Sequence, residues 1–213
     1  MGEERVPGGQ HGEAQIMLGV LNAIEVDSGA TQRVMSRELG IALGLTNAYL
    51  KRCVRKGYVK VSQAPANRYA YYLTPKGFAE KSRLTAQYLL GSFHFYRGAR
   101  RQCSDVFAEC ARIGWRRVLL VGVSDLAEIA TLCAGEHEVT LVGIFDPTAG
   151  ETTFAGLSVV GQLDDAEMHD AAVVTDLKAP QASFDRLVRS LPVERVLAPS
   201  LLRISRIPPN LAR

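Results

Sequence analysis

The chain has 213 residues, of which 47% are hydrophobic and 22% charged, and its net charge is +3. This composition is typical of a folded globular protein with one large domain or two small ones. It argues against a membrane protein, because no apolar run approaches the ~18–20 residues that a bilayer requires. The polar start lacks the apolar core of a signal peptide, so we expect a cytoplasmic protein.

The charge is distributed unevenly along the sequence. Residues 1–113 hold 16 Lys or Arg against 9 Asp or Glu, a net charge of +7. Residues 114–213 hold 9 against 13, a net charge of −4. A basic half joined to an acidic half is typical of a polyanion-binding module that carries a module of another kind.

The basic half begins with a Gly/Pro-rich stretch, residues 1–12, that we expect to be disordered. Apolar residues at helical spacing predict a helix from Glu13. Thr31 is a suitable N-cap for a second helix, and Gly57 ends a third. Two short strands separated by a loop follow. Residues 13–74 therefore have the element order of a winged helix-turn-helix.

Thr74-Pro75 predicts the start of a further helical segment, because proline is favoured in the first turn. Residues 75–114 could form one long helix or two, with Gly91 and Gly98 as the breaks. The segment has a long apolar face that a lone winged helix cannot cover. We expect it to pack against the first helix and a second subunit, which makes the protein a homodimer.

From Trp115 the pattern becomes that of an α/β domain. Continuous apolar runs bounded by turn residues indicate buried parallel strands, and helical segments alternate with them. The expected strands are RRVLLVGV, EVTLVGIFD, GLSVVG, DAAVVTDL and VERVLAP. Residues 115–213 are therefore predicted to form a Rossmann-like domain with an open parallel sheet.

The third helix, LTNAYLKRCVRKG, has the side chains that a DNA recognition helix needs. With Leu45, Leu50 and Val54 turned inward, the residues left for base edges and phosphates are Thr46, Asn47, Tyr49, Lys51, Arg52, Arg55 and Lys56. Asn47 could bind adenine and Arg52 guanine, each through two hydrogen bonds. Arg68 on the wing could reach the minor groove.

The charge around this helix supports double-stranded DNA as the partner. Between Arg33 and Lys60 the sequence holds seven Lys or Arg and one acid, Glu38. Such an imbalance is the electrostatic footprint of DNA binding, although a solvated basic helix would show the same charge.

The loop after the first predicted strand of the second half resembles a degenerate dinucleotide-binding loop. It keeps Gly122 but has Ser124 at the second glycine position, followed by Asp125. Asp146 ends the next strand, where an acidic side chain could bind ribose hydroxyls. These four residues are the candidate ligand site for an unknown cofactor, a nucleotide or a nucleotide sugar. The alternative is a Rossmann-like domain kept for dimerisation.

The string TQRVMSRELGIALGLTNAYLKRCVRKGYVKV…RYAYYLTPKGFAEKSRLTAQYL carries a family resemblance over about 60 residues. It resembles the MarR-type regulators associated with exopolysaccharide gene clusters. The most specific pieces are the LG-x-x-N-x-x-LK core and YLTPKG-x-x-EKSRLT after the wing. The resemblance implies a DNA-binding regulator of polysaccharide or envelope genes.

The second half carries a resemblance of its own. RRVLLVGVSDLAEIA…VTLVGIFD…FAGLSVVGQLDDAE is similar to the nucleotide-binding domains of polysaccharide-biosynthesis enzymes. In those families the pocket takes a nucleotide or a nucleotide sugar.

Catalysis finds little support in the sequence. There is no G-x-S-x-G elbow, no HExxH pair and no Cys/His spacing of a metal site. Cys103 and Cys110 are seven residues apart and could form a redox sensor, or could be two ordinary buried thiols. We therefore expect a DNA-binding regulator rather than an enzyme. The alternative is an enzyme using NAD or a nucleotide sugar, with the winged helix as an interaction module.

Overall fold

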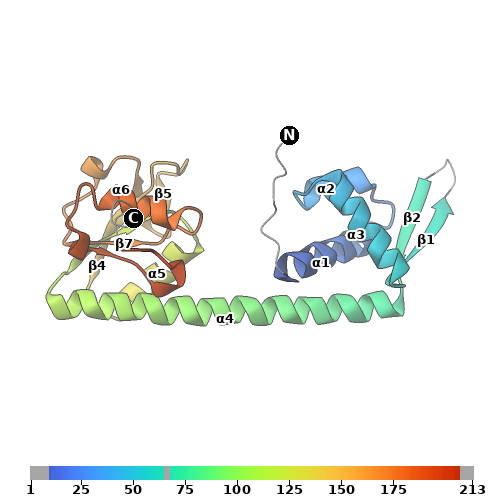
Figure 1. Cartoon of the computed structure of the whole chain (residues 1–213), viewed down its shortest axis with the longest axis horizontal. Coiled ribbons are helices and arrows are strands. Elements are labelled where there is room, and N and C mark those ends of the chain that lie inside the picture. The colour runs from blue at the N-terminus through green and yellow to red at the C-terminus, as the bar shows by residue number, and fades with distance from the viewer. Residues whose placement is uncertain (1–9, 65–67, 207–213) are drawn as a thin grey trace, which may run out of the picture. The chain divides into compact units, whose positions relative to one another are not determined.

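A computed structural model describes residues 10–64 and 68–206 (Figure 1). The chain divides into two compact units, Met1–Ser92 and Phe93–Arg213, which we call the front unit and the rear unit. The boundary lies inside one helix, α4 (Pro75–Ile113), so the segment that the sequence left as one helix or two is a single helix of 39 residues.

The front unit has the element order of a winged helix-turn-helix (Figure 1). Its elements are α1 (Gln10–Val26), α2 (Gln32–Glu38), α3 (Leu43–Arg55), β1 (Val59–Ala64), β2 (Arg68–Leu73) and the first part of α4. The first helix begins inside the segment that was expected to be disordered, of which residues 1–9 lie outside the described part of the chain. The third begins at Leu43, earlier than predicted.

The helices of the front unit enclose a small apolar core. Val20 and Leu21 of α1, Met35 of α2 and Cys53 of α3 are all fully buried there, and Leu84 of α4 joins them. Two local features hold these helices in place. Thr31 caps α2 as predicted, since its hydroxyl accepts the Val34 N–H at 3.3 Å. The hairpin is tied to the loop after α1, because the Tyr71 N–H donates to Ser28 O at 2.8 Å.

The start of α4 docks closely on the end of α3. The Thr74 hydroxyl accepts the Gly77 N–H at 3.0 Å and donates to Gly57 O at 2.6 Å. A Cβ at Gly77 would lie 2.0 Å from Tyr58 O, a distance that no side chain can occupy. The Thr-Pro-Lys-Gly string of the sequence is therefore a docking element, in which threonine caps the helix and glycine admits the neighbouring backbone.

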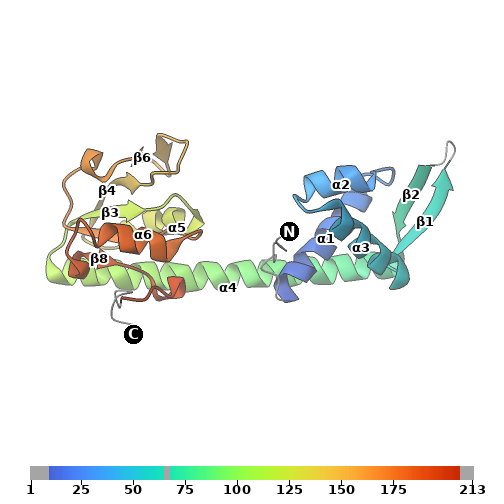
Figure 2. The same cartoon turned by 45° about the horizontal axis from the view of Figure 1, so that its top comes forward.

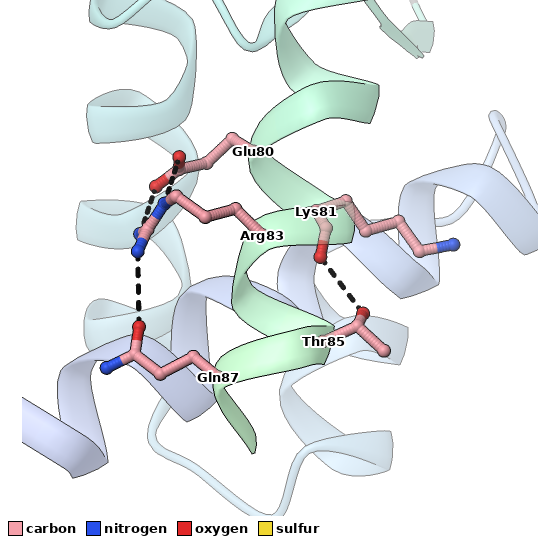
Figure 3. Close-up of polar contacts among 5 residues, drawn as sticks. All are labelled: Glu80, Lys81, Arg83, Thr85 and Gln87. Atoms are coloured by element: carbon pink, nitrogen blue, oxygen red, sulfur yellow. Dashed lines mark hydrogen bonds and ion pairs between the residues drawn. The ribbon is translucent and has the colours of Figure 1, made fainter. Parts of the chain in front are cut away.

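The first turns of α4 carry polar pairs on their surface. Arg83 donates to the Glu80 carboxylate at 2.8 Å and to Gln87 Oε1 at 3.2 Å (Figure 3). Lys81 forms an ion pair with Glu25 of α1. These pairs stabilise the helix only modestly, because one partner in each, Arg83 or Glu25, is well exposed to solvent.

The rear unit is built on a six-stranded sheet of order β5-β6-β4-β3-β7-β8 (Figure 2). Its strands and α-helices are β3 (Arg117–Val121), α5 (Asp125–Ala134), β4 (Thr140–Phe145), β5 (Thr153–Phe154), β6 (Leu157–Val160), β7 (Ala171–Val174), α6 (Pro180–Leu187) and β8 (Val196–Leu197). Three 3₁₀ turns lie at Leu163–Asp165, Val193–Arg195 and Ser200–Leu202. The five predicted strands are all present and are parallel to one another.

The prediction of a wholly parallel sheet is wrong at one edge. The two-residue strand β5 pairs antiparallel with β6, so the sheet is mixed. Chain order reverses at β3, which lies between β4 and β7. Loops after β3 and β7 therefore meet at the carboxyl edge of the sheet, where open α/β sheets bind their ligands.

The second part of α4 belongs to the rear core. Ala99, Cys103, Phe107 and Cys110 are at most 1% exposed and pack with the strands. The Gln102 side-chain oxygen accepts the backbone N–H of Leu201 at 2.7 Å, which ties the helix to the last 3₁₀ turn. One helix thus contributes to two separate cores.

Candidate nucleic-acid interface

Helix α3 has a buried face and an exposed face. Thr46, Tyr49, Leu50 and Cys53 are buried, at 0–8% exposure. Lys51 and Arg55, one turn apart, lie on the opposite side and are exposed, with Asn47 half-buried beside them. The exposed face therefore offers two cations and one amide to a groove of DNA.

Three predicted positions on this helix need correction. Thr46 and Tyr49 were expected to face DNA, but both lie in the front core. The Thr46 hydroxyl is satisfied locally by Ala42 O at 3.3 Å, so it can be buried without an unpaired donor. Burial also raises the pKa of the Tyr49 phenol. Val54, expected inside, is 37% exposed.

Arg52 points to the side of the helix. Its guanidinium donates to the Glu13 carboxylate of α1 at 3.0 Å and lies 6.0 Å from the centre of the Tyr49 ring. The pair is partly open to solvent, so it can contribute up to about 1 kcal/mol of stability. In the free chain Arg52 therefore braces α3 against α1. Nothing in the sequence indicated that Glu13 would be the ion-pair partner of Arg52.

A second basic group lies where α3 meets α4. The ammonium groups of Lys56 and Lys76 lie 5.7 and 5.6 Å from the centre of the Tyr58 ring. Lys76 also donates to Lys56 O at 3.0 Å. Lys56 was predicted as a DNA contact, whereas Lys76 was missed. The Thr-Pro-Lys-Gly string could have revealed Lys76, because this string places Lys76 beside the end of α3.

The wing is the hairpin β1–β2. Its register runs from Val59 opposite Leu73 to Ala64 opposite Arg68. Lys60 is exposed on β1. The side chain of Arg68, predicted to reach the minor groove, lies outside the described part of the chain.

The predicted ligand loop of the rear unit is closed by its own hydrogen bonds. Ser124 is the N-cap of α5, and its oxygen accepts the N–H groups of Leu126 and Ala127 at 3.1 and 3.2 Å. Its hydroxyl donates to Thr175 O at 2.6 Å. These two N–H groups are therefore satisfied within the chain and are not free to bind a phosphate.

Gly122 is required by the protein itself. Its φ is +101°, and a Cβ would lie 2.6 Å from the Cα of Asp176. The glycine thus admits the chain that follows β7, a role that its place in the loop pattern did not reveal. Asp125 is exposed in the first turn of α5.

Asp146 also has intramolecular partners. Its carboxylate accepts the Val123 N–H at 2.9 Å, and the N–H and hydroxyl of Thr148, each at 2.8 Å. Burial alone would raise its pKa, but these hydrogen bonds outweigh burial and hold the pKa below its usual value. A ribose hydroxyl bound at this edge would have to share the carboxylate with Val123 and Thr148.

The cysteines that could have formed a redox sensor are buried. Burial raises the pKa of Cys103 to about 12 and that of Cys110 to about 11. Cys53 and Cys133 are buried as well. Thiols with such pKa values hold almost no thiolate at neutral pH, so these side chains serve as small apolar groups of the two cores.

Comparison with known proteins assigns the front unit. Residues 14–60 match the family described as winged helix-turn-helix DNA-binding. The front unit therefore carries a winged helix-turn-helix DNA-binding domain, and the match spans α1, α2, α3 and the start of β1. No curated protein sequence matches the chain.

Among solved structures, the PcaV transcriptional regulator from Streptomyces coelicolor is similar to part of this chain. It is 25% identical with a TM-score of 0.31, and the match covers 33% of this chain and 54% of PcaV. PcaV in complex with its natural ligand is 22% identical with a TM-score of 0.35, over 44% of this chain and 62% of PcaV. The chain thus spans little more than half of that regulator.

A longer similarity is to methyltransferases. Human N-acetylserotonin methyltransferase in complex with S-adenosylmethionine is 11% identical with a TM-score of 0.34, over 82% of this chain and 72% of that one. The O-methyltransferase NcsB1 from neocarzinostatin biosynthesis, solved with S-adenosylmethionine and a naphthoic acid, is 12% identical with a TM-score of 0.26, over 93% and 67%.

These matches correct two expectations. The sequence was expected to encode no enzyme and to take a nucleotide or nucleotide sugar. Two of the structures that match most of the chain are instead methyltransferases with S-adenosylmethionine bound. At TM-scores below 0.5, the likeness assigns neither their activity nor their ligand to this chain.

Within residues 10–64 and 68–206, no helix is both long and apolar enough to cross a membrane.

Proposed function

We propose that this chain is a transcriptional regulator that binds double-stranded DNA through α3 and acts as a homodimer. The observation that carries the proposal is the exposed face of α3, where Lys51 and Arg55 stand free of the core inside a segment that matches a DNA-binding family. Asn47 lies beside them and supplies an amide for base edges.

The surroundings of α3 support the same function. Lys56 and Lys76 place two more cations at the end of the helix. Cations at this spacing neutralise phosphates and release counterions, which gives affinity without sequence preference. The resemblance of the front unit to regulators of exopolysaccharide gene clusters supports polysaccharide or envelope genes as the targets.

The rear unit is proposed to have the Rossmann-like arrangement. Its support is the strand order, with β3 in the middle and the chain order reversing beside it. The rear unit is a second folded unit, and α4 connects it covalently to the DNA-binding front unit.

The test is selection of duplexes from a random library by the full chain, followed by binding measurements over a series of salt concentrations. Lys51→Ala and Arg55→Ala should each weaken all duplexes and lower the salt slope by about one unit. Asn47→Ala should relax preference at one base pair, at a cost of roughly 1–3 kcal/mol.

Two controls make the test specific. Arg112→Ala removes the same charge from the rear unit, where Arg112 pairs with Glu109, and should leave DNA affinity unchanged. Arg52→Ala should weaken binding less than Lys51→Ala, because Glu13 holds its guanidinium in the free chain. Equal losses for Lys51→Ala and Arg112→Ala, or no selected duplex, would contradict the proposal.

A further inference from the structure

One cation of α3 is held by a carboxylate from another helix. The Arg52 guanidinium donates to the Glu13 carboxylate at 3.0 Å, and the pair joins the first turn of α1 to the last turn of α3. Lys51 and Arg55, on the same helix, form no ion pair with any residue that the structure describes. Glu13 therefore occupies one cation of the candidate DNA-binding helix and leaves its neighbours free.

The two helix ends favour this pair. The first turn of a helix carries a partial positive charge and the last turn a partial negative charge, so Glu13 and Arg52 each lie at the end that stabilises them. The guanidinium also lies 6.0 Å from the centre of the Tyr49 ring. The Arg52 side chain is still 37% exposed and that of Glu13 54% exposed. The pair is thus held in place, yet it remains open to an anion from outside.

Arg52 borders the cations to which the proposed function assigns DNA. Residues three and four apart on a helix are neighbours on its surface, so Arg52 lies beside Arg55 and Lys56, which are both exposed. A phosphate that reaches this side of α3 therefore meets a guanidinium that is already paired with a carboxylate. Carboxylate and phosphate oxygens accept the same guanidinium N–H donors, so the two anions exclude each other from these donors.

We propose that Glu13 competes with DNA phosphate for Arg52 and thereby lowers the affinity of α3 for all duplexes. The inference rests on the proposed function and deepens it by naming a residue that limits affinity. Breaking a partly exposed ion pair costs a factor of up to about five in an equilibrium constant. The carboxylate that is left behind also repels the phosphate that replaces it. Both effects act on every duplex, because a phosphate contact carries no sequence information.

The experiment measures the affinity of the full chain for a selected duplex and for a random duplex over a series of salt concentrations. Glu13→Gln keeps the shape of the side chain and removes its charge. This variant should bind both duplexes about two- to fivefold more tightly than the wild type. Its salt slope should be steeper by up to about one unit, since Arg52 is then free to neutralise one more phosphate.

Glu25→Gln is the matched control. It removes the same charge from the same helix, but Glu25 pairs with Lys81 of α4 and lies about 18 Å further along α1. At that distance its charge is largely screened from α3 at physiological salt, so the affinity should stay close to that of the wild type. Circular dichroism checks that both variants are folded.

The Arg52→Ala background shows whether the gain in affinity depends on Arg52. Glu13→Gln added to Arg52→Ala should change affinity no more than Glu25→Gln does. A full gain in the absence of Arg52 would mean that Glu13 acts by general repulsion, and would overturn the proposal. Unchanged or weaker binding by Glu13→Gln would overturn it too, and would leave the pair as a structural brace. A gain confined to the selected duplex would also contradict it, because Arg52 would then contact a base edge.

Failure of this inference can be told apart from failure of the proposed function. If the wild type binds duplexes and Glu13→Gln binds them no more tightly, α3 remains the DNA-binding helix and only the role of Glu13 is rejected. If neither the wild type nor Glu13→Gln binds any duplex, even at the lowest salt concentration, DNA binding itself is rejected.

Discussion

Gly77 of α4 lies against the backbone of Tyr58, in the short segment between α3 and β1. A methyl group there would lie 2.0 Å from Tyr58 O, and the obstacle is backbone that cannot rotate away. Gly77→Ala should therefore lower the free energy of unfolding of the front unit by about 1–3 kcal/mol. Urea unfolding followed by circular dichroism measures the change.

Gly44 provides the matched control for this prediction. It lies in the first turn of α3, and a Cβ there would meet nothing within 4 Å. Gly44→Ala should leave stability unchanged or raise it by up to about 1 kcal/mol, because alanine favours helix. Similar losses of unfolding free energy in Gly77→Ala and Gly44→Ala would contradict the explanation that Gly77 is needed for the close contact with Tyr58.

The recognition helix shows where residue-scale prediction from sequence stops. The basic positions Lys51 and Arg55 were found because charge has a strong signal. The phase of the helix was misjudged because Val54 is apolar and Thr46 is polar, yet Val54 is exposed and Thr46 is buried. Thr46 can be buried because Ala42 O satisfies its hydroxyl, a contact that appears only once the helix is built.

At the scale of elements, two carboxylates hold loops of the rear sheet in place. Asp146 accepts the Val123 N–H, and Asp170 accepts the N–H groups of Arg116 and Arg117 at the start of β3. Hydrogen bonds from these backbone groups keep the pKa of Asp170 below its usual value, and Asp146 is lowered likewise.

A pH dependence follows from these pKa shifts. A carboxyl whose pKa is lower in the folded than in the unfolded chain adds stability above its unfolded pKa of about 3.9. That stability is lost as the pH falls through the folded pKa. Between pH 7 and pH 3 the urea midpoint of the wild type should fall further than that of the Asp146→Asn, Asp170→Asn double variant. Parallel curves for the two proteins would contradict this origin of acid sensitivity.

The elements of the rear unit were largely predictable, whereas its loop chemistry was not. Five strands are recognisable in the sequence as apolar runs, but β5 has only two residues, Thr153 and Phe154, and no periodicity. Gly122 and Ser124 matched a ligand loop by spacing. Their actual partners, Asp176 and Thr175, follow a strand some 50 residues later, and only the folded sheet brings them together.

At the scale of the whole molecule, the proposed homodimer would present two copies of α3. The selected DNA should therefore contain two half-sites in inverted repeat, about one helical turn or ~34 Å apart. Inserting about five base pairs between them places the half-sites on opposite faces of the duplex and should abolish the added affinity of the pair. Inserting a full turn should restore part of it. Binding that ignores the spacer would mean that each chain acts alone.

The homodimer proposed above, in which α4 with its charge-free run of residues 84–96 is the expected contact, also affects how much protein DNA binding requires. Pairing of two copies is second order in chain concentration, so the paired fraction falls steeply when the chain is scarce. Occupancy of a two-half-site operator would then rise faster than in proportion to the copy number. A change in gene dosage would then change operator occupancy more than proportionally.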